Sequence, residues 1–77
     1  MNAECDLNTF RAITKQMTYK DLTRFVGEPD ADIGRGIHIM AFKLPDGGRV
    51  LVGTPDFVKL MYIKHESKDG KIEDLLR

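Results

Sequence analysis

The segment Pro45-Asp46-Gly47-Gly48 sets the tightest limit on what this chain can fold into. Proline presets φ at the first turn position, aspartate suits the second, and Gly47 can adopt the left-handed conformation that closes a type I turn with a bulge. β-rich runs flank the segment, at residues 37–44 and at residues 49–52 or 49–54. The pattern therefore predicts an antiparallel β-hairpin.

Further turn signals follow the hairpin. Thr54-Pro55-Asp56 predicts a second turn, and the Asp-Gly pair within residues 67–71 favours the positive φ of a third. These turns predict a third strand over residues 60–64. Residues 72–76 are then either a short edge strand or a terminal helical turn.

The N-terminal part of the chain has a helical pattern. Leu7, Phe10 and Ile13 are three residues apart, so they lie along one stripe of a short helix, for which Asp6 is a candidate N-cap. Two short helices are expected in this part of the chain.

The second of these helices has signals at both ends. Thr18 followed by Asp21 predicts a capping box, and Gly27 with Pro29 behind it predicts the stop, so this helix is expected over residues 19–26. The acidic and glycine-containing stretch 28–36 is expected to be an irregular loop.

The length of 77 residues fits one small domain, residues 1–77. We expect an α+β fold with two short N-terminal helices packed on one face of a three- or four-stranded antiparallel β-meander. Cys5 is the only cysteine, which excludes an intramolecular disulfide and a structural cysteine-bound zinc. Without such crosslinks the apolar residues must be buried efficiently or covered by a partner, and a homodimer is one solution.

Charge and hydropathy exclude several classes of partner. Twelve basic residues balance twelve acidic ones, so no net charge draws the molecule to nucleic acid or anionic lipid. The apolar runs are far shorter than the ~20 residues of a membrane span. The first six residues lack the basic and then apolar pattern of a signal peptide, which makes the cytoplasm the default expectation for localisation.

The period of two in the strands separates the two faces of the predicted sheet. In the first hairpin strand, Ile37, Ile39 and Ala41 share one face, whereas Met40 and Phe42 share the other with His38 and Leu44. Both faces are partly apolar, and two short helices can cover only one of them. An apolar face that stays exposed usually marks a contact with another protein.

The candidate protein-binding residues follow from that argument. They are Ile39, Met40, Phe42, Met61 and Tyr62. The sequence leaves open which face the helices cover: if they cover the side of Met40 and Phe42, the exposed patch consists of Ile37, Ile39, Leu60 and Tyr62 instead.

Metal and phosphate motifs are incomplete. Gly34-Arg35-Gly36 lacks the third glycine of a dinucleotide-binding loop and precedes a strand. Asp30 and Asp32 have the first spacing of a calcium loop, but its required glycine and glutamate are missing. His38 and His65 lie on different strands without companion ligands. We therefore predict no metal and no cofactor.

Catalytic chemistry has no support either. Cys5 and Ser67 lack the base and the orienting group that a nucleophile needs, so we expect no catalytic residues and no enzyme. The C-terminal lysines around Tyr62 are a combination found in nucleic-acid surfaces, but acidic residues are interspersed among them. Nucleic acid is therefore the less favoured partner. The lysines are Lys59, Lys64, Lys68 and Lys71.

Several stretches together resemble a known group of proteins. They are the Met-Thr helix start within residues 13–18, residues 21–29 at the helix end, Gly34-Arg35-Gly36, and the Asp-Gly hairpin at residues 44–50. Their order is similar to the repeat unit of the β-lactamase-inhibitor-protein-like (BLIP-like) fold, shared with the SmpA/OmlA (BamE) family of small bacterial envelope proteins. The resemblance implies a non-catalytic domain that holds a partner protein on its sheet or sheet edge, and a location in the bacterial envelope.

Together these features predict a non-catalytic protein-binding or assembly module. Its partner, another protein or a second copy of itself, is expected on an exposed sheet face or edge strand. The alternative is a nucleic-acid-associated regulator that uses the C-terminal lysines.

Overall fold

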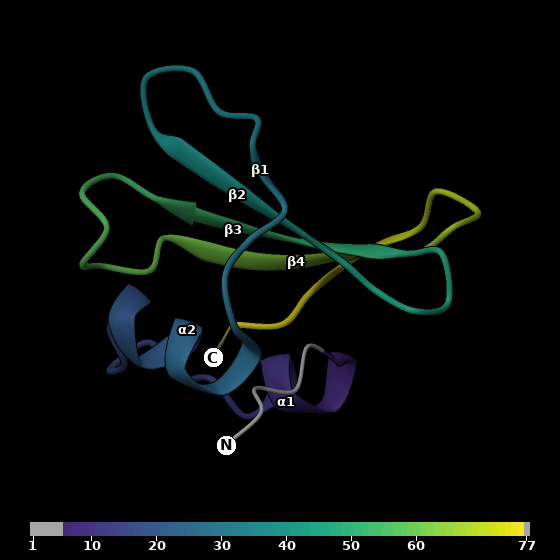
Figure 1. The fold of residues 1–77 in the computed structure, drawn as a ribbon, viewed down its shortest axis with the longest axis horizontal. Helices are drawn as coiled ribbons and strands as arrows, with labels where there is room; N and C mark the ends of the chain where they lie inside the picture. Colours follow the sequence, from purple (N-terminus) through teal and green to yellow (C-terminus); the bar gives the residue numbers. More distant parts are fainter. Residues whose placement is uncertain (1–5, 77) are drawn as a thin grey trace.

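Two short helices precede a five-stranded antiparallel sheet in the computed structural model, which describes residues 6–76 (Figure 1). The strands follow one another across the sheet in chain order, so the sheet is a meander. The elements are α1 (Leu7–Arg11), α2 (Tyr19–Val26), β1 (Ala31–Asp32), β2 (His38–Lys43), β3 (Arg49–Thr54), β4 (Tyr62–Glu66) and β5 (Ile72–Asp74). The fold is therefore α+β, as expected from the sequence.

Both helices begin where their caps predict. The Asp6 side chain accepts a hydrogen bond from the Thr9 amide at 2.9 Å, which starts α1. At α2, the Thr18 hydroxyl accepts a bond from the Asp21 amide, and the Asp21 carboxylate accepts one from the Thr18 amide. This reciprocal pair is the predicted capping box. Gly27, at φ 86°, ends the helix.

The predicted hairpin turn is confirmed. Gly47 has φ 91°, and the Leu44 amide donates to the Gly48 carbonyl at 2.9 Å, so the turn closes as its residues predict. The turn between β4 and β5 repeats this arrangement, with Gly70 at φ 92° and the Ser67 amide donating to the Lys71 carbonyl. Residues 72–74 form an edge strand, which decides between the two alternatives for the C-terminal segment.

The sheet has five strands, whereas three or four were expected. The additional strand β1 lies within residues 28–36, which the sequence predicted to be an irregular loop. It is only two residues long and exposed, so it has no hydrophobic alternation and depends on its pairing with β2. The prediction of residues 60–64 for the third strand was wrong by two residues, because the polar positions His65 and Glu66 continue β4.

The core lies between the helices and one face of the sheet (Figure 1). Phe10 of α1 packs against Phe42 of β2 at a ring-centroid distance of 5.2 Å, and both side chains are fully buried. Directly after β5, the Leu75 amide still donates to the Ile63 carbonyl of β4 at 2.8 Å, and the Leu75 side chain enters the same core. An ion pair between Arg11 and Glu73, 2.8 Å long, also joins α1 to β5 on the surface.

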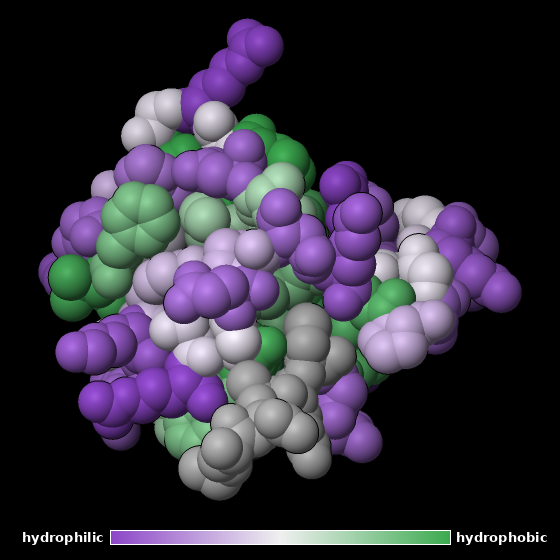
Figure 2. All heavy atoms as spheres, in the orientation of Figure 1, coloured by the Kyte–Doolittle hydropathy of each residue, from purple (hydrophilic) through white to green (hydrophobic). Residues whose placement is uncertain are grey.

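Hydrophilic and hydrophobic residues are mixed on the surface seen in the orientation of Figure 1, without one large apolar area (Figure 2). Within residues 6–76, no helix has the length and apolar character that crossing a membrane requires.

Candidate functional site: the open face of the sheet

The helices cover one face of the sheet and leave the other uncovered. Strand register assigns Met40, Val52 and Ile63 to the covered face, because they are direct partners across β2, β3 and β4 and all are buried. Phe42 and its partner Val50 lie on the same side. The residues that alternate with these lie on the opposite side, which we call the open face.

An apolar stripe crosses the open face. Ile39 pairs with Gly53, and Gly53 pairs with Tyr62, so one row runs across three strands. Ile33 extends this row beyond β1, since its amide donates to the Ile39 carbonyl at 2.9 Å. Leu51 stands in the next row at the centre of the sheet. We call Ile33, Ile39, Leu51 and Tyr62 the apolar stripe; Ile33 is 47% exposed and the other three are half-buried.

Tyr62 lies across the neighbouring strand. A Cβ atom at Gly53 would come within 2.3 Å of the Tyr62 ring, so the ring occupies the space above this glycine. The Lys64 ammonium lies 5.0 Å from the centre of the same ring, within cation–π distance. An aromatic side chain that covers a strand glycine is a known way of stabilising a sheet surface.

The open face becomes charged toward the hairpin turn. Lys43, Arg49 and Glu66 form one row across β2, β3 and β4, which we call the charged end. Arg49 Nε lies 2.8 Å from Glu66 Oε1. In the row of Leu51, Lys64 is the direct partner of Leu51 on one side and of Asp74 on the other. Both signs of charge are thus present on this face.

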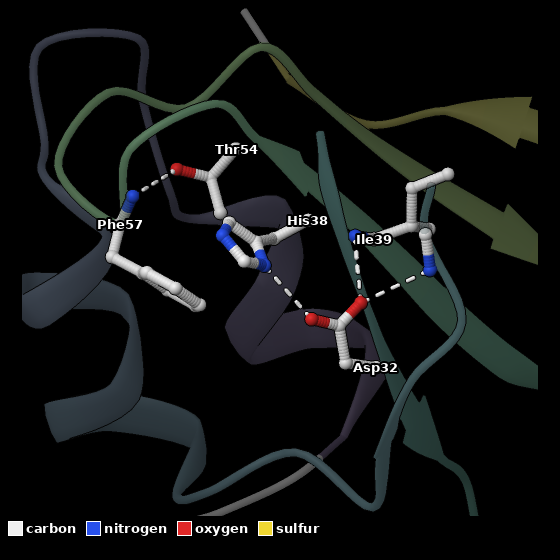
Figure 3. A network of polar contacts seen from close by, with 6 residues as sticks. Asp32, His38, Ile39, Thr54 and Phe57 are labelled. Carbon is white, nitrogen blue, oxygen red and sulfur yellow. Dashed lines mark hydrogen bonds and ion pairs between the residues drawn. The ribbon is translucent and has the colours of Figure 1, made fainter. Parts of the chain in front are cut away.

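Asp32 holds the turn that brings Ile33 beside Ile39 (Figure 3). Its Oδ1 accepts hydrogen bonds from the amides of Gly34, at 3.0 Å, and Ile39, at 3.3 Å, while Oδ2 lies 2.9 Å from His38 Nδ1. These contacts, with that of His38 the strongest, lower the pKa of the Asp32 carboxyl. Gly34 is required here, because a Cβ atom would lie 2.2 Å from the Ile37 carbonyl oxygen.

An aromatic cluster supports the same end of the sheet from the covered side. The His38 ring lies 4.0 Å from the ring of Phe57 (Figure 3). The centre of the Phe57 ring in turn lies 5.5 Å from that of Tyr19. Phe57 has φ 62°, and its amide donates to the Thr54 hydroxyl at 3.0 Å, which holds this turn in place. Burial, followed by the charges of Glu28 and Asp32, raises the pKa of Tyr19.

The hydroxyl on the strand beside the Asp32–His38 pair is buried and already hydrogen-bonded. Thr54 is the partner of His38 across β2 and β3, but its side chain is fully buried and accepts the bond from Phe57. A nucleophile has to reach its substrate. No group of three or more potential metal-ligating side chains occurs among residues 6–76.

The five candidate binding residues divide between the two sides of the sheet. Ile39 and Tyr62 lie on the open face. Met40 and Phe42 do not, because they point toward the helices and are 8% and 0% exposed. Met61 directly precedes β4, is 54% exposed, and lines a pocket together with Lys15 and Leu76.

The alternative patch is also only partly on the open face. Leu60 is buried at 9% exposure and belongs to the core. Sequence reasoning missed Leu51 and Ile33. Leu51 alternates with the buried Val50 and Val52, so the period of two in this strand could have placed Leu51 on the opposite face. No sequence pattern indicated the position of Ile33, because its neighbours predicted a loop.

The other candidate residues are dispersed. His38 pairs with Thr54 at one end of β3 and His65 with Val50 nearer the other, so the two histidines do not form a site. The Nε2 atom of His65 is buried, and no residue of the described segment hydrogen-bonds to it. Ser67 bonds to Asp69 within the last turn. Cys5 lies outside the described residues.

The C-terminal lysines do not gather on one surface. Lys59 lies before β4, Lys64 lies on the open face, and Lys68 and Lys71 lie in the turn that follows β4. β4 spans about 17 Å at about 3.4 Å per residue, which separates Lys59 from Lys68 and Lys71.

Comparison of the chain with protein-family models, with curated proteins and with solved structures finds no match. The resemblance to the BLIP-like fold and the SmpA/OmlA family therefore stays a prediction. The geometry of the open face carries the functional argument.

Proposed function

We propose that this protein is a non-catalytic protein-binding module that holds its partner against the open face. The observation that carries the proposal is the apolar stripe, which crosses the sheet on the side opposite both helices. Apolar residues that cluster on a surface, bordered by polar ones, are typical of protein–protein contacts.

The composition of the open face suits such a contact. Tyr62 offers a large side chain with few rotatable bonds, and it is supported by Gly53 below and Lys64 beside it. Tyrosine is enriched among the residues that contribute most to binding. The charged end, with Arg49 paired to Glu66, supplies a polar rim.

The edges of the sheet are less suited to binding. β1 has two residues and β5 has three, so either edge offers few backbone groups to an added strand. Glu73 of β5 is also engaged by Arg11. We therefore place the contact on the open face and not on an edge strand.

The test compares three immobilised baits in an extract of the source cells, with bound proteins identified by mass spectrometry. Leu51→Glu puts a charge at the centre of the open face. Phe25→Glu makes the same change at a 51% exposed apolar side chain of α2 and serves as the matched control. A partner retained by wild type and Phe25→Glu but lost by Leu51→Glu supports the proposal. If every retained protein binds all three baits equally, the open face is not the binding surface.

A further inference from the structure

The open face has an internal symmetry that follows from the register. β3 is the central strand, with β2 on one side and β4 on the other. A second copy can be placed on the open face by a rotation of 180° about an axis parallel to β3. The β4 strand of this second copy then lies over β2 of the first copy. Each residue of the open face then meets a residue of the same row on the other copy.

This superposition brings apolar residues together. Ile39 of each copy faces Tyr62 of the other, since both belong to the row that contains Gly53. Leu51 lies on β3 and therefore faces Leu51 of the second copy, on the axis. A contact of this kind is isologous, so each pair occurs twice and the assembly is closed.

The charged end is complementary to itself in the same arrangement, whereas Lys64, in the row of Leu51, faces Ala41 of the other copy. In the row of the charged end, Lys43 on β2 faces Glu66 on β4 of the other copy. The two Arg49 side chains meet on the axis, but each is paired with its own Glu66 at 2.8 Å. The whole chain has a formal net charge of zero, so two copies approach without long-range repulsion.

The area of the open face determines how strong the contact between two copies is expected to be. Five strands about 4.8 Å apart, with up to six residues at about 3.4 Å each, give a face of roughly 20 by 20 Å. Two such faces bury at most about 800 Å² in total, because β1 and β5 are shorter than the central strands, and this area lies below that of stable specific interfaces and within that of weak, transient contacts. The contact between two copies is therefore expected to be weak and dependent on concentration.

We propose that the open face binds the open face of a second copy of this chain, sheet against sheet, about a two-fold axis along β3. This inference rests on the proposed function, because it names the partner of the same surface. The two sheets then lie about 10 Å apart, as in a β-sandwich, with the apolar stripes of the two copies in contact and their charged ends facing each other.

The first experiment measures the solution mass by light scattering over a hundredfold range of protein concentration. Wild type and Phe25→Glu are expected to shift from the monomer mass toward twice that mass. Leu51→Glu and Leu51→Lys, which each place like charges on the axis, are expected to stay monomeric. An equimolar mixture of these two variants is expected to regain the dimer, since opposite charges then meet on the axis.

The second experiment does not depend on how the variants fold. Isotope-filtered NMR on a mixture of labelled and unlabelled wild type detects contacts between copies only. Contacts from Leu51 methyl groups to Leu51, and from Ile39 methyl groups to Tyr62 ring protons, are expected. A dimer without these contacts, a wild type that stays monomeric throughout the concentration range, or a mixture that fails to regain the dimer overturns the inference.

The outcomes separate this inference from the proposed function. A monomeric wild type that still retains a different protein through Leu51 refutes the second copy and leaves the binding module standing. A monomer that retains nothing refutes both. A dimer lost in Phe25→Glu but kept in Leu51→Glu places self-association on α2 and also refutes the inference.

Discussion

The ring of Tyr62 occupies the space above Gly53, where a Cβ atom would approach it to 2.3 Å. The glycine and the tyrosine are direct partners in the β3–β4 ladder, so the sheet itself holds the ring over β3. This pair shapes the apolar stripe, because it turns a strand glycine into a site for a large aromatic side chain.

Gly53→Ala is expected to displace the Tyr62 ring. The atoms that the new methyl group meets are at the far end of the tyrosine side chain, which can turn away, so the free energy of unfolding falls by about 1 kcal/mol, the low end for overpacking. NMR tests the geometry through the side-chain protons of Lys64, which lie near the ring. Tyr62→Phe keeps the ring and should keep their shifts. Unchanged shifts in Gly53→Ala contradict the prediction.

Gly34→Ala and Gly36→Ala are expected to differ in stability. At Gly34 a Cβ atom meets backbone atoms, the Ile37 carbonyl oxygen at 2.2 Å and the Ile39 nitrogen at 2.5 Å, so the turn must open. Gly36 has φ 86° but no atom near the Cβ position, so its substitution costs only the left-handed strain of about 1–2 kcal/mol. Urea unfolding of both variants measures the difference, and an equal or smaller loss for Gly34→Ala is inconsistent with this geometry.

Phe42→Ala and Leu51→Ala separate the covered face from the open face. Phe42 is fully buried against Phe10, so its truncation is expected to lower the free energy of unfolding by about 3–5 kcal/mol. Leu51 is half-buried, and its truncation should cost about 1 kcal/mol. Thermal or urea unfolding distinguishes the two. Similar losses would mean that Leu51 belongs to the core and not to an exposed surface.

Acid is expected to destabilise the fold through three carboxylates. Hydrogen bonds lower the pKa of Asp21 at the α2 cap, of Asp32 beside His38, and of Asp56, which accepts from the Lys59 and Val58 amides. A carboxyl whose folded pKa is lowered contributes stability above its unfolded pKa, about 3.9 for aspartate, and this contribution is lost as pH falls through the folded pKa.

The urea midpoint should therefore change little above about pH 5 and fall progressively below about pH 4, within the interval between the unfolded and the lowered folded pKa values. Unfolding curves at a series of pH values measure this. Asp32→Asn removes one of the three carboxylates and should flatten the decline. A midpoint that rises as the pH falls below 4 contradicts the sign of the effect.

Local chemistry was sufficient to predict much of the fold. The capping box of Thr18 and Asp21 and the left-handed Gly47 depend on residues within three or four positions of one another, and both occur as predicted. β1 was not predicted, because Ala31 and Asp32 have no strand pattern and pair only because β2 lies beside them. The start of β4 was also misplaced: the Asp56 carboxylate accepts hydrogen bonds from the Val58 and Lys59 amides in the preceding loop, and the strand begins only at Tyr62.

The candidate site was predicted in part. Ile39 and Tyr62 lie on the open face, whereas Met40 and Phe42 lie in the core. Ile39 alternates with Met40 and Phe42 along β2, and each of these apolar side chains by itself suits a buried position.

By itself, the sequence determined where helices, turns and the central strands form, because caps and turns are set by neighbouring residues. Only the tertiary structure decided which side of the sheet faces the helices. On one side, Met40 and Phe42 lie next to Val50, Val52 and Ile63 of the neighbouring strands. Together these side chains pack against α1 and α2. The other side aligns Ile39 with Gly53 and places Lys43, Arg49 and Glu66 in one row, and the apolar side chains that α1 and α2 turn inward, such as Phe10 and Leu22, would desolvate these charges without offering them a polar partner. That alignment exists only once the strands are in register.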